Sequence, residues 1–168
     1  MDFREIREFL VDSGKYIIAV IILLFVVINV FTIQSIIGPS MNPGLKESDI
    51  LLLSKFHYKM FDIKRYDVIA LNDKSSKYMV KRIIGLPGET VEYKDGKLYI
   101  NEKEFEDEFA HLTKDFKLKE IIAEDTYFVL GDNRGDSLDS RDFGPIKKTQ
   151  IIGKPYFRFW PIWKFKIV

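Results

Sequence analysis

Residues 16–37 read YIIAVIILLFVVINVFTIQSII, and they divide the chain into two parts of different character. The stretch contains no charged residue, and eighteen of its 22 positions are apolar, so a helix of this length can cross the ~30 Å hydrocarbon core of a bilayer. No small-x-small cleavage pattern follows it, which disfavours a signal peptide. A buried core helix is also disfavoured, because the rest of the 168-residue chain is too short to wrap it. The sequence therefore predicts an uncleaved transmembrane anchor.

Basic residues around the anchor predict its orientation. Arg4, Arg7 and Lys15 precede the stretch, whereas Lys46 is the first charged residue after it. Because Lys and Arg are in excess on the cytoplasmic side of membrane proteins, we expect the N-terminus in the cytoplasm. The expected organisation is a cytoplasmic tail (1–15), a single-pass anchor in the cell membrane (16–37) and an extracytoplasmic β-rich domain (38–168).

The domain after the anchor carries mostly strand signals. Short runs rich in Val, Ile, Tyr and Phe, bounded by Gly, Pro, Asn or Asp, are typical of β-strands. The predicted strands are Ile50–Ser54, Asp67–Leu71, Tyr78–Ile84, Thr90–Tyr93, Lys97–Ile100, Tyr127–Leu130 and Ile151–Phe159. Asp95-Gly96, between two alternating runs, predicts a type I′ hairpin turn. We expect a mostly β fold, in which one transmembrane helix precedes a compact antiparallel β-sheet domain.

A small insertion, at about residues 102–124, interrupts the strand pattern. Phe105, Phe109, Leu112 and Phe116 recur there at the spacing of one helix face, among many charges. We expect this insertion to contain one or two helical turns.

The C-terminal segment, Pro155–Val168, is rich in Trp, Tyr and Lys, which membrane interfaces favour. The alternation of Phe157, Arg158 and Phe159 predicts a final core strand, and we expect its aromatic end to reach the lipid headgroups.

Composition excludes several kinds of site. The chain has 26 Lys and Arg against 25 Asp and Glu, a formal charge of +1 and no cysteine. Without cysteine there can be no Cys-based zinc or iron–sulfur site and no Cys nucleophile. The near-neutral charge offers no basic footprint for nucleic acid. We therefore expect no metal, no other cofactor and no nucleic-acid partner.

One lysine in the predicted strand Tyr78–Ile84 is a candidate base. Alternation places Lys81 on the same strand face as Met79 and Ile83. Such a lysine either extends its ammonium group to water or, if buried, has its pKa lowered towards neutrality and can deprotonate a serine. Because His57 and His111 are the only histidines, a Ser–Lys dyad is the simplest nucleophilic interpretation.

Three ordered motifs resemble those of bacterial type I signal peptidase in its short, single-anchor form. They are G-P-S-M-x-P (38–43), K-R-x-x-G-L-P-G-E (81–89) and G-D-N-R-x-x-S-x-D-S-R (131–141). The resemblance covers nearly the whole chain. It implies a membrane-bound serine endopeptidase whose partners are membrane lipid and exported preproteins, from which it cleaves N-terminal signal peptides through an acyl-enzyme.

The resemblance also assigns the reacting residues. Ser40 corresponds to the nucleophile, and Lys81 corresponds to the general base that replaces histidine. The backbone N–H of Ser40 is expected to donate to the oxyanion. For the pockets that accept small side chains before the cut, we expect contributions from Ile36, Met41 and Leu45.

Supporting roles follow from the same resemblance. Ser137 corresponds to a serine that orients the lysine amine. Asp139 and Arg141 correspond to a supporting ion pair. Arg82 lies on the strand face opposite the lysine and requires a carboxylate, for which the resemblance indicates Asp132.

Two other functions remain to be considered. Self-cleaving repressors use the same Ser–Lys chemistry, but they need a DNA-binding domain and no membrane span, which the anchor argues against. A membrane-tethered β domain that binds exported chains without cutting them is the second alternative. Loss of Ser40 or Lys81 would be its sequence mark, and both residues are present.

Overall fold

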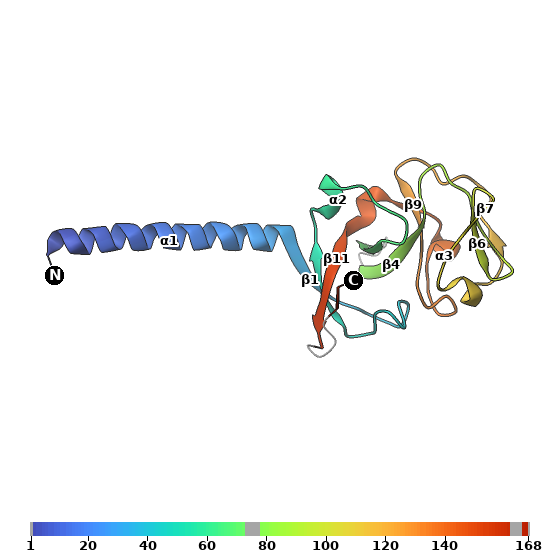
Figure 1. Cartoon of the computed structure of the whole chain (residues 1–168), viewed down its shortest axis with the longest axis horizontal. Helices are drawn as coiled ribbons and strands as arrows, with labels where there is room; N and C mark the ends of the chain where they lie inside the picture. The colour runs from blue at the N-terminus through green and yellow to red at the C-terminus, as the bar shows by residue number, and fades with distance from the viewer. Residues whose placement is uncertain (1, 73–77, 162–165, 168) are drawn as a thin grey trace.

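The computed structural model describes residues 2–72, 78–161 and 166–167, and in it one long helix projects from a β-rich domain (Figure 1). This helix, α1, spans Phe3–Val30. Its segment Val11–Val30 has a mean hydropathy of 2.3 and is not buried against the rest of the chain, as expected of a helix surrounded by lipid. The predicted N-terminal apolar helix is therefore confirmed.

The helix differs from the predicted anchor at both ends. It begins at Phe3, within the predicted tail, and it ends at Val30, before Ile37. The following residues, Phe31–Ser35, form strand β1, which pairs antiparallel with β2 (Ile50–Ser54). The apolar run continues without a break from helix into strand, so composition alone does not reveal that sheet pairing takes over at its end.

Eight strands form the larger sheet, in the order β1-β2-β11-β3-β4-β9-β10, with β12 paired to β11. All of these pairs are antiparallel. The further strands are β3 (Val68–Asn72), β4 (Tyr78–Gly85), β9 (Thr126–Leu130), β10 (Ile146–Lys147), β11 (Ile151–Trp160) and β12 (Lys166–Ile167). The predicted strands of this sheet agree with the structure to within one residue at each end. In the C-terminal segment, residues 162–165 and 168 lie outside the described residues, so contact with headgroups there stays a prediction.

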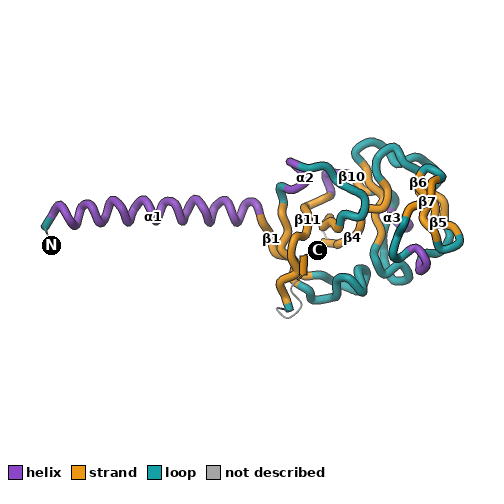
Figure 2. Tube along the Cα trace, viewed as in Figure 1, coloured by secondary structure: helices purple, strands orange, loops and turns teal. Residues whose placement is uncertain are grey.

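Four strands form the smaller sheet, which lies at the end of the domain far from α1 (Figure 2). Its order is β7-β6-β5-β8, from β5 (Val91–Lys94), β6 (Lys97–Ile100), β7 (Lys103–Phe105) and β8 (Phe116–Lys117). Asp95 and Gly96 join β5 to β6 and have φ values of 51° and 72°, as a type I′ turn requires.

The insertion contains one helical turn, at the lower limit of the predicted one or two. Its helical part is one 3₁₀ turn, η1 (Ala110–Leu112), while Phe105 and Phe116 lie on strands β7 and β8. Both phenylalanines pack against the cluster of buried residues around Tyr93. Strand pairing with β6 and β5 therefore sets their positions, and their helix-like spacing does not reflect a helix.

The remaining helical elements are short, and they are α2 (His57–Met60), α3 (Ser140–Phe143) and the 3₁₀ turn η2 (Lys148–Gln150). One cluster of buried residues joins the two sheets, with Ile84 and Phe128 from the larger sheet and Leu98 from the smaller one. A second cluster fixes the loop that follows β1, and its members are Ile36, Met41, Leu45, Leu51 and Val68.

Candidate active site

The first candidate residue, Ser40, lies in the loop between β1 and β2. The neighbouring side chain of Met41 is only 1% exposed and anchors the loop in the core. The carbonyl of Ser40 accepts a hydrogen bond from the N–H of Asn133 at 3.0 Å, and the Asn133 side-chain amide donates to the Pro39 carbonyl at 3.3 Å. Two kinds of contact thus hold the loop that carries Ser40. Met41 packs into the core, and Asn133 of the segment 131–141 forms hydrogen bonds with the loop backbone.

Lys81 lies in β4, opposite Ile69 of β3, and its side chain is only 2% exposed. Its Nζ donates a hydrogen bond to Oγ of Ser137 at 3.1 Å. Burial lowers the pKa of Lys81 to about 8, because desolvation disfavours the charged amine. The carboxylate of Asp139 raises this pKa and the guanidinium of Arg141 lowers it. The sequence left open whether the Lys81 amine extends to water or is buried. In the structure it is buried.

Gly131 is the point at which these segments meet. A side chain at this position would collide with the Ser40 carbonyl and with the Ser137 side chain. Its N–H donates to Oδ2 of Asp139 at 3.1 Å. The absence of a side chain at Gly131 therefore allows Ser40 and Ser137 to approach the same backbone, beside Asp139.

Asp139 is completely buried, and it caps the N-terminus of α3. Its carboxylate accepts hydrogen bonds from Nε and Nη2 of Arg141, both at 2.8 Å. Burial alone would raise the pKa of Asp139, but hydrogen bonds from Arg141, the Gly131 N–H and the Ser137 hydroxyl hold it below its usual value. Asp139 therefore carries its charge, and Ser137 links it to Lys81.

Arg82 forms a bidentate ion pair with Asp132. Its Nε lies 2.8 Å from Oδ1 and its Nη2 lies 2.7 Å from Oδ2. A third hydrogen bond joins Nη1 to the carbonyl of Tyr66 at 3.0 Å. Since Asp132 is almost completely buried, this pair ties β4 to the segment that begins at Gly131.

A cavity of about 220 Å³ brings Ser40 and Lys81 together. Ile36, one of the three residues expected at the substrate pockets, lines it. Met41 and Leu45 are not among its lining residues, because they point into the core beneath the Ser40 loop, and we drop them from the predicted pocket. The other lining residues are Gln34, Ser35, Ile37, Pro39, Leu51, Ala70, Tyr78, Met79, Val80, Asp136 and Leu138.

The sequence did not predict that several of these residues line the cavity. Tyr78, Met79 and Val80 could have been found, because they directly precede Lys81 in the predicted strand Tyr78–Ile84. Ala70 lies opposite Val80 in the neighbouring strand, and that register is set by tertiary pairing. Neither histidine lines the cavity: Nδ1 of His57 contacts the Tyr156 hydroxyl at 2.6 Å, and His111 belongs to η1.

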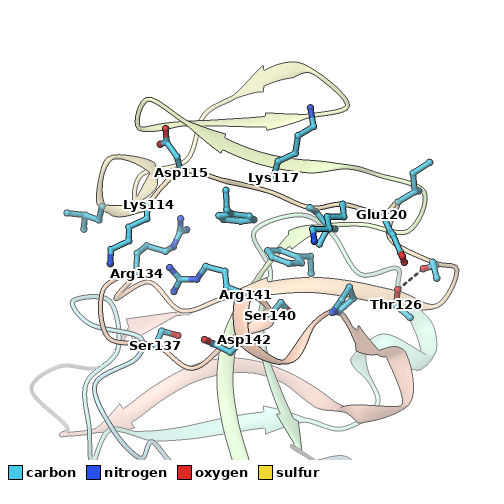
Figure 3. A pocket seen from close by; sticks show the side chains of 18 of the residues that line it. Lys114, Asp115, Lys117, Glu120, Thr126, Arg134, Ser137, Ser140, Arg141 and Asp142 are labelled. Carbon is cyan, nitrogen blue, oxygen red and sulfur yellow. Dashed lines mark hydrogen bonds between the residues drawn. The ribbon is translucent and has the colours of Figure 1, made fainter.

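A second cavity, of about 850 Å³, is lined by residues from the segments 112–128 and 134–145 (Figure 3). Ser137 and Asp142 lie on one side of it, and Asp115 and Lys117 lie on the side of the smaller sheet (Figure 3). Across the residues that the structure describes, there is no group of three His, Asp or Glu side chains placed to hold a metal ion.

Arg134, at the edge of this second cavity, joins the two sheets. Its Nη1 and Nη2 donate to the Asp107 carboxylate at 2.7 and 3.1 Å, and its Nε donates to the Gly131 carbonyl at 2.9 Å. Nη1 also lies 3.0 Å from the Tyr93 hydroxyl and 2.8 Å from Oγ1 of Thr113. The sequence contains no signal for this network, because its members come from separate segments of the chain.

Comparison with known proteins identifies the family. A family model described as "Signal peptidase, peptidase S26" matches residues 10–160. The chain belongs to this family. It is a serine hydrolase of the peptidase S26 family, and its N-terminal apolar helix makes it a membrane-anchored enzyme.

Relatives agree over most of their length. The chain is 38% identical over 152 residues to "Signal peptidase I V" of Bacillus subtilis (strain 168), covering 82% of this chain and 90% of that protein. It is 36% identical to "Signal peptidase I" of Bacillus caldolyticus, covering 89% and 91% of the two chains. A crystal structure of a signal peptidase I from Enterococcus faecalis V583 is similar with a TM-score of 0.52 and 37% identity, covering 56% of this chain and 97% of that one.

Proposed function

We propose that this protein cleaves N-terminal signal peptides from exported preproteins with a Ser–Lys dyad, on the extracytoplasmic face of the membrane. The observation that supports this best is the position of Ser40 and Lys81 in one cavity, with the lysine amine buried and its pKa lowered to about 8. A lysine of this kind is partly neutral near pH 7, so it can serve as a general base.

The neutral amine of Lys81 accepts the proton of the Ser40 hydroxyl, and Oγ attacks the scissile carbonyl carbon. The oxyanion that forms accepts a hydrogen bond from the N–H of Ser40. The protonated Lys81 then gives its proton to the leaving amine, the C–N bond breaks, and the acyl-enzyme remains. Water, deprotonated by Lys81, releases the acyl group in the second half of the reaction.

Ser137 orients the amine of Lys81. Because Nζ donates one hydrogen to Oγ of Ser137, the amine has fewer orientations in which its lone pair can face Ser40. Asp139 fixes Ser137 in turn, through the hydrogen bond between their side chains. Arg141 neutralises the Asp139 carboxylate, so that its charge raises the lysine pKa less than an unpaired carboxylate would.

The substrate lies between residues 34–40, which run from the end of β1 into the loop that carries Ser40, and residues 78–81 of β4, and most of these residues line the cavity. An extended peptide can add to such segments by backbone hydrogen bonds, with alternate side chains pointing into the protein. A cavity of about 220 Å³ walled by Ile36 and Val80 admits small side chains before the cut. The basic residues Arg4, Arg7 and Lys15, which precede the apolar stretch, favour a cytoplasmic tail and a domain on the opposite face.

The test is cleavage of a preprotein by the full chain and by two variants, Ser40→Ala and Lys81→Met. We expect the wild type to cut and both variants to lose at least ~10³-fold in rate, because each lacks one member of the dyad. The matched control is Lys97→Met, which removes an exposed lysine of the smaller sheet and is expected to keep full activity.

Two results would contradict this function. Full activity in Lys81→Met would remove the dyad from the mechanism. Binding of the preprotein by a folded wild type without any cleavage would favour the tethered, non-catalytic binding domain instead.

A further inference from the structure

Asn133 contacts both peptide units that flank Ser40. Its side-chain amide donates to the Pro39 carbonyl at 3.3 Å, and its backbone N–H donates to the Ser40 carbonyl at 3.0 Å. The Pro39 carbonyl also accepts a hydrogen bond from the N–H of Asn42 at 2.9 Å. Two donors, one from within the loop and one from the segment 131–141, therefore fix the direction of the Pro39 carbonyl.

The direction of this carbonyl decides the direction of the Ser40 N–H. Both groups belong to one planar peptide unit, and this unit is trans, since the cis bonds of the described residues precede Pro43 and Pro161. In a trans peptide unit the C=O and the N–H point in opposite directions. The N–H of Ser40 therefore points away from the side-chain amide of Asn133.

The Ser40 N–H is available to a ligand. Within the part of the chain that the structure describes, no carbonyl or side chain accepts a hydrogen bond from it. Pro39 and Ser40 both line the 220 Å³ cavity, which Lys81 also lines. A backbone donor without an acceptor, next to a nucleophile and its base, is what an oxyanion hole requires.

Asn133 also restricts the backbone torsions of Ser40. The two carbonyls that it contacts belong to consecutive planar units, and φ and ψ of Ser40 are the only rotations between these units. Because both units are hydrogen-bonded to the same residue, these rotations have little freedom. The direction of Cβ, from which Oγ projects, is set with them. Asn133 thus aligns the nucleophile together with the oxyanion donor.

We propose that Asn133 is a positioning residue for the oxyanion hole, and that its side-chain amide holds the Pro39–Ser40 peptide so that the Ser40 N–H meets the oxyanion. This inference rests on the proposed function, because the oxyanion forms only if Ser40 attacks a peptide carbonyl. Asn133 acts through a backbone group that no side-chain substitution at Ser40 can remove. The hydrogen bond to the oxyanion strengthens in the transition state, so loss of the amide lowers kcat and leaves KM close to the wild-type value.

The experiment compares Asn133→Ala and Asn133→Asp with the wild type, in the full chain and with a preprotein as substrate. Asn133→Asp keeps the shape of the side chain but replaces the donor by an oxygen that repels the Pro39 carbonyl. We therefore expect kcat to fall by ~10²-fold, against ~10-fold for Asn133→Ala. The rates are compared at their high-pH limit, so that a change in the pKa of Lys81 does not enter.

The matched control is Asn101→Asp, the same substitution in the turn after β6. Oδ1 of Asn101 accepts a hydrogen bond from the Thr90 N–H at 2.8 Å, and an aspartate at this position can still accept it. This variant should keep full activity.

A pair of peptide ligands separates positioning from a general loss of structure. With a peptide aldehyde, Oγ of Ser40 bonds to the aldehyde carbon, the serine proton moves to Lys81, and the π electron pair moves to the former carbonyl oxygen, which takes the oxyanion position. The matched alcohol, in which CH₂OH replaces the aldehyde, cannot form this bond. We expect both Asn133 variants to weaken inhibition by the aldehyde by about the factor lost in kcat/KM, and to leave inhibition by the alcohol unchanged.

Equal kcat values for Asn133→Asp and the wild type would overturn the proposal and leave the proposed function standing. An equal loss of affinity for the aldehyde and the alcohol would also overturn it, because the substitution would then disturb the whole site. A wild type that cleaves no preprotein would overturn the proposed function, and this inference with it.

Discussion

Two basic side chains, Lys81 and Arg134, are buried in this domain, and they differ in their hydrogen-bond partners and in the direction of their pKa shifts. The amine of Lys81 donates to the hydroxyl of Ser137, and burial lowers its pKa to about 8. The guanidinium of Arg134 is fully buried against the Asp107 carboxylate. Burial alone would lower the pKa of Arg134, but Tyr93 and Asp107 raise it above its usual value.

The difference separates a group held for chemistry from a group held for structure. A buried amine next to a neutral hydroxyl can lose its proton, whereas a buried guanidinium with a bidentate carboxylate stays charged and cross-links the segments it touches. Arg134 joins the smaller sheet to the Gly131 carbonyl, so it supports the loop on which Ser137 lies. The same substitution at the two sites should therefore act in opposite directions on stability.

The largest effect is expected from Arg134→Met. The substitution leaves the Asp107 carboxylate buried without its partner, which costs about 3–5 kcal/mol in comparable buried pairs. Thermal unfolding of the full chain in detergent measures it. An unfolding temperature equal to that of the wild type would mean that the pair does not hold the two sheets together.

Lys81→Met is expected to stabilise the protein while it abolishes cleavage. Below pH 8 the native state of the wild type holds a proton on a buried amine, at a cost of up to about 3 kcal/mol relative to an exposed lysine. Because the folded pKa lies below the unfolded one, wild-type stability should rise from about pH 8 towards pH 10, and this rise should be absent in Lys81→Met. Unfolding by denaturant at several pH values measures both effects. A variant that unfolds more easily than the wild type at pH 7 would contradict them.

A smaller effect is expected from Ser137→Ala. The loss of one hydrogen bond to the lysine amine should lower kcat by roughly tenfold, since it removes orientation but not the base. The pH at which activity rises should not move. Ser140→Ala is the matched control in the same motif, because Oγ of Ser140 accepts from the Val129 N–H and does not contact Lys81. It should lower the unfolding temperature and leave kcat close to that of the wild type.

Much of the larger sheet could be predicted from the sequence, because alternation and turn residues mark each strand locally. The strand Phe31–Ser35 could not, since its apolar residues continue those of the anchor and only pairing with β2 distinguishes it. In the candidate site, the motifs indicate Ser40 and Lys81, but they do not show which way Met41 points. Its burial depends on Leu51 and Val68, which arrive from other strands. For the same reason, the pairing of Arg134 with Asp107 requires the folded arrangement of both sheets.

The most direct measurement of the central claim, that a buried Lys81 is the base for Ser40, is the pH dependence of kcat/KM for preprotein cleavage. Because the reacting form of Lys81 is the neutral amine, activity should rise with pH and reach half of its limit near pH 8. A rise centred at the ordinary lysine value of about 10.4 would contradict the buried, lowered pKa. A rise near 6.5, the ordinary value for histidine, that persisted in Lys81→Met would assign the base to another residue.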